Sequence, residues 1–254
     1  MELTDTHCHL DLADFDADRG QVLARCRELG VTRILVPAVD AAGWDGLLDL
    51  CRSEAGLYPA LGLHPVHIDT HRDGDIDALA GRIERERPVA VGEIGLDYHL
   101  TELDRDRQQA LFEAQLAIAR DAGLPVVLHV RKAHDAVIAT LRRIRVAGGI
   151  VHAFNGSLQQ ARQYMDMGFG LGFGGTLTYE GSTRIRKLAA QLPPDALVLE
   201  TDAPDMVVSA HRGERNSPEY LPLCLQALAD VRGEDPADLA ALTTRNAIDL
   251  LHLH

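Results

Sequence analysis

Paired cysteines, long apolar runs and targeting segments are missing from this sequence. The four cysteines among its 254 residues, Cys8, Cys26, Cys51 and Cys224, show no CxxC spacing, so we expect reduced thiols rather than disulfides. No apolar run approaches the roughly 18 residues that a membrane span needs. The first residues lack the basic and apolar regions of a signal peptide. The sequence therefore predicts a cytoplasmic protein with no membrane partner.

Positive charge is also scarce. The chain has 25 Lys and Arg residues against 38 Asp and Glu residues, which gives a net charge of -13. A broad grip on duplex nucleic acid depends on many Lys and Arg contacts to phosphates, so the acidic balance argues against it. A small basic pocket over a metal centre stays compatible with this charge. The 46% hydrophobic and 25% charged contents exclude collagen, coiled coil and disorder.

Short apolar segments rich in β-branched residues alternate with amphipathic segments along the chain. We expect the former to be strands, at Leu3–His9, Thr32–Val39, Tyr58–Leu63, Val89–Ile94, Pro125–Val130, Gly149–Ala153, Gly168–Phe173 and Ala196–Asp202. We expect the latter to be helices, at Asp16–Leu29, Ala42–Glu54, Gly74–Glu86, Asp104–Ala122, Ala133–Arg145, Leu158–Met167 and Ser182–Gln191. Pro218–Val231 and Asp235–Leu251 add the eighth helix and one extra helix.

This alternation predicts the fold class. Nearly continuous apolar strands that helices separate are parallel and buried on both faces. Eight such repeats in about 250 residues predict an α/β protein, a single TIM (β/α)8 barrel. Because no linker, low-complexity run or internal repeat interrupts the pattern, we expect one domain over residues 1–254. An open doubly wound sheet is the alternative architecture.

Titratable residues stand at the ends of the expected strands, where a TIM barrel carries its functional groups. Strand alternation would point His7 and His9 to the same side. A buried Glu93 inside an apolar segment needs a cation or a proton. Each such residue alone is more often a satisfied core residue, but together they predict a shared site. The six candidate ligands are His7, His9, Glu93, His129, His152 and Asp202.

Four imidazoles and two carboxylates are more ligands than one tetrahedral zinc ion needs. Two divalent ions that share a carboxylate would use them all, so we predict a binuclear centre. Imidazole-rich ligation suits Zn, Mn, Fe or Ni, and a carboxylate-bridged pair also admits Mg. The predicted cofactors are therefore two divalent ions whose identity stays open among Mg, Mn, Zn and Ni.

At this point the sequence resembles the TatD-type metal-dependent deoxyribonucleases over nearly its whole length. The motifs that carry the resemblance are DTHCHLD at 5–11, LGLHP at 61–65, GEIGLDY at 92–98, LHVRKAHD at 128–135, VHAFNGS at 151–157, ETDAPD at 200–205 and RGERNSP at 212–218. The resemblance implies a barrel hydrolase with a two-metal centre. It implies that His7, His9 and Asp202 hold one ion, that His129 and His152 hold the other, and that Glu93 is the bridge.

Two positions depart from the commoner pattern of that family. Asn155 stands where many members have Ser, and Ser217 stands where many have an acidic residue. Neither is a ligand position, so the departures bear on substrate choice and not on the metals.

Further residues are placed to act beside the ligands. His64 follows the third expected strand, and it is either a plain loop residue before Pro65 or a residue that supports a ligand or acts as the acid for the leaving group. Arg131 shares the side of His129, where it would hold a phosphate bidentately unless it forms an ordinary surface ion pair. We predict catalytic roles for Asp202, His64 and Arg131, and a substrate contact for Arg131 and for His134.

Other residues are expected to lie around the ligands without binding metal themselves. Arg212, Arg215 and Asn216 form the one local basic cluster on a C-terminal loop, and they are either substrate-binding residues or ordinary solvated groups. We expect Glu200 and Asp5 to be outer partners of ligand histidines, because metal-bound imidazoles usually donate their second N–H to a carboxylate or carbonyl.

Residues 170–175 match the GxGxxG pattern of dinucleotide-binding folds. The pattern needs an open βαβ unit, and here it falls in the seventh of eight barrel repeats. We therefore predict no nucleotide cofactor, and we expect these glycines to let a substrate approach the barrel mouth closely.

The predicted function is hydrolysis of phosphodiester bonds in DNA by a metal-activated water, in the manner of a 3'-5' exonuclease. Since no extended basic track is visible, the expected partner is single-stranded DNA or a frayed end, and we expect a monomer. The alternative is a metal-dependent amide or ester hydrolase, such as a D-aminoacyl-tRNA deacylase. A metal-binding barrel without enzymatic activity is a third reading.

Overall fold

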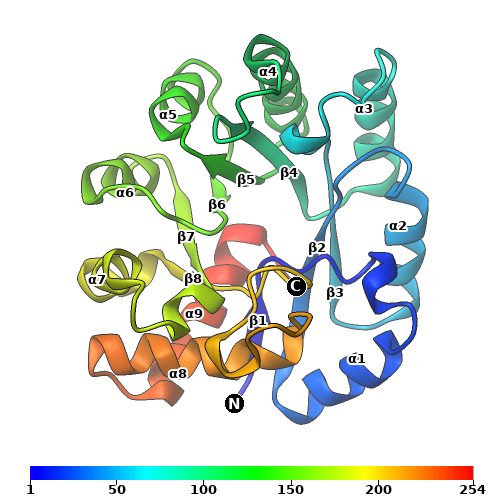
Figure 1. Cartoon of the computed structure of the whole chain (residues 1–254). Coiled ribbons are helices and arrows are strands. Elements are labelled where there is room, and N and C mark those ends of the chain that lie inside the picture. The colour runs from blue at the N-terminus through cyan, green and yellow to red at the C-terminus, as the bar shows by residue number, and fades with distance from the viewer. Residues whose placement is uncertain (254) are drawn as a thin grey trace.

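The strands form a parallel barrel in which each strand pairs with the next one in sequence. The computed structural model describes residues 1–253, and within them eight strands follow the order β1 to β8. Figure 1 looks along the barrel, with the strands inside a ring of helices. The strands are β1 (Leu3–Asp5), β2 (Val31–Pro37), β3 (Leu57–Leu61), β4 (Ala90–Asp97), β5 (Val126–Arg131), β6 (Gly149–Val151), β7 (Phe169–Phe173) and β8 (Leu197–Leu199).

A helix follows each strand and covers the outside of the barrel. These helices are α1 (Arg19–Glu28), α2 (Trp44–Ser53), α3 (Asp75–Glu86), α4 (Arg105–Ala122), α5 (His134–Arg143), α6 (Leu158–Met165), α7 (Thr183–Gln191) and α8 (Leu221–Arg232). Their ends follow local sequence signals. Asp104 caps α4 by accepting the backbone N–H groups of Asp106 and Arg107, and Ser157 and Gln160 form a capping box on α6. The predicted TIM barrel is confirmed.

Hydrogen bonds between the last and first strand segments close the barrel. The backbone N–H of Thr6 donates to the carbonyl of Leu199 at 3.0 Å, and Cys8 forms a parallel bridge with Ala203. Beyond these strands, the N–H of Asp202 donates to the carbonyl of His7 at 2.8 Å. The closure excludes an open doubly wound sheet, and it joins the segment of His7 directly to that of Asp202.

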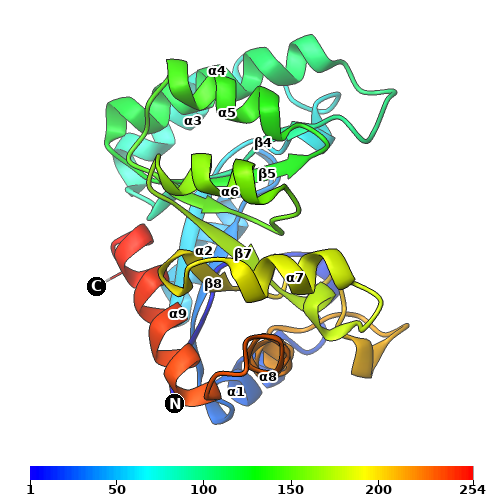
Figure 2. The same ribbon diagram turned by 90° about the vertical axis from the view of Figure 1, so that its left-hand side faces the viewer.

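One end of the barrel interior is apolar and sealed. A separate cluster of buried apolar side chains takes residues from six strands together with the extra helix α9 (Pro236–Leu251). This floor layer consists of Leu35, Ala60, Ala90, Val127, Ile150 and Val198, with Ala247, Leu251 and Leu253 below them. In Figure 2, α9 lies at the end of the barrel that also carries both termini. The extra helix therefore closes the barrel at the end opposite to the strand C-termini.

Polar side chains follow the floor layer on the same strands. His129, His152 and Glu200 each stand two residues after a member of that layer. Alternate residues of a strand share one face, so these three side chains also point into the barrel. Strand alternation thus places an apolar floor and a polar chamber above it in one interior.

Strand β4 needs an irregularity to bring its carboxylates inside. Val91 and Ile94 both belong to the cluster between strands and helices, and the register with β5 shifts between them. Regular alternation would turn Glu93 to the same outer face as Val91. The shift turns Glu93 inward, and Asp97 then faces the same interior four residues later.

A membrane-spanning helix is not found in the part of the chain that the structure describes.

Candidate metal centre

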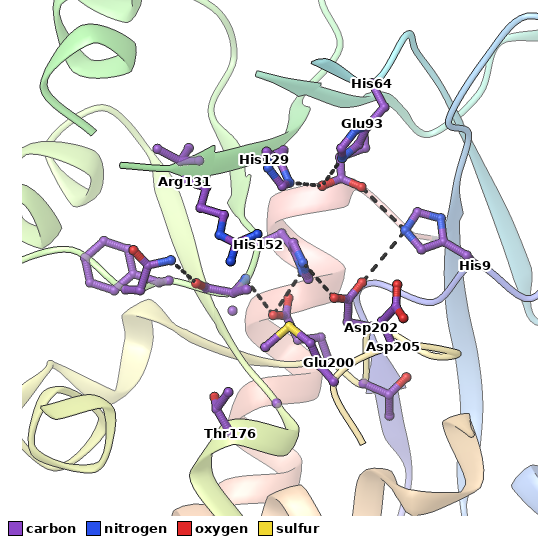
Figure 3. A pocket seen from close by; sticks show the side chains of 18 of the residues that line it. His9, His64, Glu93, His129, Arg131, His152, Thr176, Glu200, Asp202 and Asp205 are labelled. Atoms are coloured by element: carbon purple, nitrogen blue, oxygen red, sulfur yellow. Dashed lines mark hydrogen bonds and ion pairs between the residues drawn. The ribbon is translucent and has the colours of Figure 1, made fainter. Parts of the chain in front are cut away.

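Seven donor residues meet at the C-terminal ends of the strands, and Figure 3 labels all of them except His7. They form three overlapping groups whose donor atoms lie within 4.8 Å of one another: His7–Glu93–His152, His7–His9–Asp202 and His64–Glu93–His129. All six predicted ligands are therefore brought together, from five strand ends that are far apart in the sequence. His64 is the seventh residue of these groups, and the sequence placed it beside the ligands.

His7, His9 and Asp202 present their donor atoms to a common point. The Nε2 atoms of His7 and His9 are 3.2 Å apart, and Nε2 of His9 lies 3.8 Å from Oδ1 of Asp202. Nδ1 of His9 donates to the carbonyl of Pro37 at 3.1 Å, so the neutral ring has its lone pair on Nε2, facing the other two residues. Lone pairs that converge in this way need a cation or a proton between them, and the donor set fits a divalent metal.

Glu93 lies between two groups of imidazoles. Its Oε2 is 3.0 Å from Nε2 of His7, while its Oε1 is 3.1 Å from Nδ1 of His129 and 3.3 Å from Nε2 of His64. Burial alone would raise the pKa of Glu93, but the surrounding imidazoles outweigh burial and hold the pKa well below its ordinary value. Glu93 is therefore ionised, with one oxygen toward each side of the centre.

The protein's own charges favour positive charge at this point. Burial would lower the pKa of His9, but the contacts to Glu93 and the charge of Asp202 outweigh burial and raise the pKa to about 9. Burial would likewise raise the pKa of Asp202, which His152 and then His7 and His9 lower to about 2. Glu93 and Asp202 thus stay charged at neutral pH and attract cations.

Asp97 is a buried functional residue that the sequence reasoning missed. Its Oδ2 lies 3.0 Å from Nε2 of His129, and its Oδ1 accepts the backbone N–H groups of His99 and Leu100. Burial would raise the pKa of Asp97, but His129 and these N–H groups lower it to about 2. Asp97 fixes the ring of His129 so that Nδ1 faces Glu93. The expected strand ended at Ile94, short of Asp97, whereas β4 runs to Asp97, so the even spacing of Glu93 and Asp97 along one strand went unused.

Two buried glutamines of α4 position neighbouring rim segments, and they too were missed. Gln115 accepts the N–H of Leu63 at 2.7 Å and donates to its carbonyl at 3.0 Å. Gln108 forms the same pair of bonds with Asp97, at 2.8 and 3.1 Å. Glutamines seven residues apart share the buried face of a helix. Each amide extends the backbone pairing at the end of a strand, next to His64 in one case and at Asp97 in the other.

Glu200 lies beside His152, as expected of an outer partner. Its Oε1 is 3.1 Å from Nδ1 of His152 and accepts the N–H of Ala153 at 2.7 Å. The glycines of β7 make room for it: a Cβ at Gly172 would lie 2.1 Å from Oε2 of Glu200, and one at Gly174 would lie 2.6 Å from its carbonyl oxygen. Gly172 and Gly174 also line the cavity, so the expectation that these glycines let a substrate approach closely stays a prediction beside their role of admitting Glu200.

Asp5 differs from the expectation of an outer partner for an imidazole. Its carboxylate accepts the backbone N–H of His7 at 3.1 Å, and the N–H and hydroxyl of Thr201 at 3.0 and 2.5 Å. No atom of the His7 ring is among these partners. Asp5 therefore ties the segment after β1 to the segment after β8, and it positions His7 through the backbone.

His64 and Arg131 face the same cavity. Arg131 and all of the donor residues except His7 line a cavity of about 810 Å³. Nδ1 of His64 accepts the N–H of Val66 at 3.1 Å, so its proton is on Nε2, which faces Glu93. Burial lowers the pKa of His64 to about 4, with His129 adding to burial and Glu93 opposing it. In Figure 3 the Arg131 side chain points into the cavity.

The structure does not bring the other predicted substrate residues to this cavity. His134 lies behind its wall. Both nitrogens of the Arg215 fork pair with Asp18 at 2.8 Å, and Arg212 stands 5.7 Å from the ring centre of Tyr179. The buried amide of Asn216 donates to the carbonyls of Thr201 and Asp205 and accepts the N–H of Ser217. For Asn216 and Arg215, these bonds favour structural roles.

The protein is a parallel barrel with a cluster of histidines and carboxylates at the C-terminal ends of its strands. This combination is typical of metal-dependent hydrolases. The sequence profile of the TatD related DNase family matches residues 4–252, and the chain belongs to this family. The chain is 39% identical to the uncharacterized metal-dependent hydrolase YjjV of Escherichia coli (strain K12), over 98% of this chain and 97% of YjjV.

Solved and named relatives agree with that assignment. The crystal structure of the TatD homologue YjjV superposes with a TM-score of 0.94 and 38% identity, over 99% of this chain and 98% of that chain. The 3'-5' ssDNA/RNA exonuclease TatD of Cronobacter sakazakii is 33% identical, over 97% of this chain and 96% of its own length. The protein is therefore a metal-dependent hydrolase of the TatD family.

Proposed function

We propose that this hydrolase uses two divalent ions to remove nucleotides from the 3' end of single-stranded DNA. The observation that carries the proposal is the placement of Glu93, whose two oxygens face different groups of imidazoles. One ion would be held by His7, His9 and Asp202, with Glu93 shared between the two sites. The second would be held by His129 and His152. The relative from Cronobacter sakazakii, named as a 3'-5' ssDNA/RNA exonuclease, supports the polarity and the substrate.

Residues of this chain can supply the proton steps and the phosphate contact. When bound, a pair of divalent ions lowers the pKa of a water molecule and stabilises negative charge on a phosphoryl oxygen. Asp202 is ionised at neutral pH, so its carboxylate can accept the proton of the attacking water. The Nε2–H of the neutral His64 ring can donate a hydrogen bond to the leaving oxygen, which then takes its proton from water. Arg131 can bind a non-bridging oxygen of the phosphate.

The charge of the cavity wall supports a strand end rather than a duplex as substrate. Among the described residues that line the cavity, Arg131 is the single Lys or Arg. Duplex binding usually neutralises several phosphates, and each neutralised phosphate adds to the salt dependence of binding. One guanidinium above the acidic donor residues fits one phosphate at the end of a DNA strand.

Digestion of labelled DNA tests the proposal. Single- and double-stranded DNA, labelled at the 5' end, would be incubated with protein that has been treated with chelator and then given Mg²⁺, Mn²⁺ or Zn²⁺. We expect a ladder that shortens from the 3' end of the single strand and no cleavage without added metal. If the protein hydrolyses a simple ester or D-aminoacyl-tRNA but leaves the DNA uncleaved, the nuclease proposal is overturned in favour of a carbonyl hydrolase.

Elemental analysis tests the number of ions separately. Gently purified protein at saturating metal should approach two equivalents per chain. A value that never exceeds one would contradict the binuclear centre and leave the hydrolase assignment intact.

A further inference from the structure

A row of hydrogen-bonded side chains runs from the cavity wall into the protein core. Asn155 lines the cavity, and its Oδ1 lies 3.2 Å from Nε2 of His134. Nδ1 of the same imidazole lies 3.2 Å from the hydroxyl of Tyr164. Tyr164 is fully buried and His134 is 7% exposed. The row therefore connects a polar group on the cavity wall to a fixed point in the core.

One arrangement of protons satisfies every member of the row. Burial lowers the pKa of His134, and the charge of Arg184 adds to this, so the ring is neutral near pH 7. The Tyr164 hydroxyl then donates to Nδ1, and the Nε2–H of His134 donates to Oδ1 of Asn155. This fixes the orientation of the Asn155 amide, whose Nδ2 donates to the carbonyl of Ala153 at 3.1 Å. One N–H of Asn155 is left for the cavity.

The backbone around Asn155 is held as well. The Arg184 guanidinium donates to the carbonyls of Asn155 and Gly156. Both the backbone and the side chain of Asn155 are thus fixed before any ligand arrives, and a preorganised donor loses little entropy on binding.

We infer that Asn155 is a substrate-binding residue that donates its free N–H to a phosphoryl oxygen in the cavity, and that His134 is the residue that positions it. Arg131 lines the same cavity and would bind the same phosphate with its charge. The inference rests on the proposed phosphodiester substrate and adds a neutral, oriented donor to it. The Tyr164 hydroxyl contributes by keeping the lone pair of His134 directed away from Asn155.

Affinity for inorganic phosphate tests the role of Asn155 without any turnover. Protein loaded with Mg²⁺ would be titrated with phosphate in a calorimeter. Asn155→Ala removes the donor, and we expect about tenfold weaker binding, as for a lost hydrogen bond to a charged group. Asn155→Asp keeps the shape but adds a carboxylate, so its loss should be at least as large.

Ser157→Ala is the matched control. It removes the cap of α6 two residues away and should lower the melting temperature, but it leaves the Asn155 amide and its row unchanged. We expect this variant to bind phosphate with the same affinity as the wild type.

Variants of His134 test the positioning role. His134→Phe keeps a ring beside Phe154 but has no N–H, whereas the side-chain amide of His134→Gln can still donate to Asn155. In His134→Phe we expect the KM for bis-p-nitrophenyl phosphate to rise several-fold while kcat stays within twofold of the wild-type value. In His134→Gln we expect a KM closer to that of the wild type. The side-chain amide resonances of Asn155, identified by their loss in Asn155→Ala, should shift in His134→Phe and less in Tyr164→Phe.

The outcomes separate this inference from the proposed function. Unchanged phosphate affinity in both Asn155 variants overturns the inference, even if the wild-type protein digests DNA. Weaker phosphate binding in a protein that cleaves no phosphodiester supports the role of Asn155 as an anion donor and rejects the nuclease proposal. Equal losses in Ser157→Ala and Asn155→Ala would assign the effect to the loop and also overturn the inference.

Discussion

The two ends of the barrel interior are built by the same strands and have opposite chemistry. At one end Val127, Ile150 and Val198 pack with α9 into a dry floor. Two residues further along those strands, about 7 Å away, His129, His152 and Glu200 line a chamber of charged groups. One strand periodicity therefore sets both regions, and only the identity of the residue at each inward position distinguishes them.

This difference shows how the protein divides stability from function. Burying ionised Glu93 among imidazoles costs free energy unless cations or hydrogen bonds compensate it. The floor contributes the hydrophobic burial that such a chamber cannot supply. We therefore expect substitutions in the chamber to remove activity with little change in the free energy of unfolding. Substitutions in the floor layer should lower the free energy of unfolding and leave activity unchanged.

The largest effect should come from the chamber. Glu93→Gln keeps the size of the side chain but removes the charge that both proposed ions share. We expect kcat to fall by several orders of magnitude and the metal content to drop, while the circular dichroism spectrum is unchanged. Glu102→Gln, an exposed change in the loop after β4, is the control. Full activity of Glu93→Gln would show that Glu93 is a structural acid.

The floor should respond in the opposite way. Leu251 of α9 is 1% exposed, and Leu251→Ala should lower the free energy of unfolding by about 2–5 kcal/mol through lost burial and a cavity. At temperatures where the variant is folded, we expect its metal content and kcat to equal those of the wild type. Leu223→Ala, at a leucine that is 37% exposed, should change stability by about 0.5 kcal/mol or less. A large fall in kcat for Leu251→Ala would mean that the two regions are coupled.

A third pair of substitutions sharpens the comparison within the chamber. Arg131→Ala should reduce kcat/KM for a phosphodiester by about 2–3 kcal/mol of transition-state stabilisation, because a charged hydrogen bond to phosphate is lost. An uncharged ester should be spared. Asp202→Asn should reduce turnover of both substrates, since Asp202 is assigned to the water and the metal. Equal losses for both substrates in Arg131→Ala would assign Arg131 to support of the site instead.

The smallest effect is expected outside both regions. Arg215→Ala removes the pair with Asp18 and the contact with the ring of Phe15, both partly solvated, so we expect a loss of about 1 kcal/mol or less in stability. The KM for DNA should be unchanged, and Asp18→Asn, which removes only the ion pair, should reproduce part of the stability effect. A tenfold rise in KM for Arg215→Ala alone would instead support the substrate contact that the sequence suggested.

Much of the chamber could be located from the sequence because it follows strand ends. His129 and His152 were placed by the simple rule that barrel strands end in functional groups. His7 and His9 were placed on one side by strand alternation, although β1 ends at Asp5. The prediction of a shared side holds because the bridge between Cys8 and Ala203 keeps the chain extended beyond the strand.

Residues that act through contacts distant in sequence escaped the same reasoning. In the sequence, Gln108 and Gln115 look like ordinary polar positions of a helix. Only the packing of α4 against the ends of β3 and β4 lets them hydrogen-bond the backbone there. Asn216 and Arg215 resemble a polar loop until their partners Thr201 and Asp18 are known. A side chain's role is set here by which donor or acceptor it meets, and a linear pattern does not contain that information.

The sequence by itself determined the parallel barrel, its order of elements and the set of candidate ligands. These follow from periodicities of two and of about 3.6 residues and from polar residues at strand ends, all of which are local. Only the tertiary structure decided that Glu93 turns inward at an irregularity of β4, that α9 seals the floor, and that Asp97 and His134 orient their neighbours. Each of those depends on which surfaces meet after the chain has closed into a barrel, since a hydrogen bond or a packed face exists only between groups that the whole fold brings together.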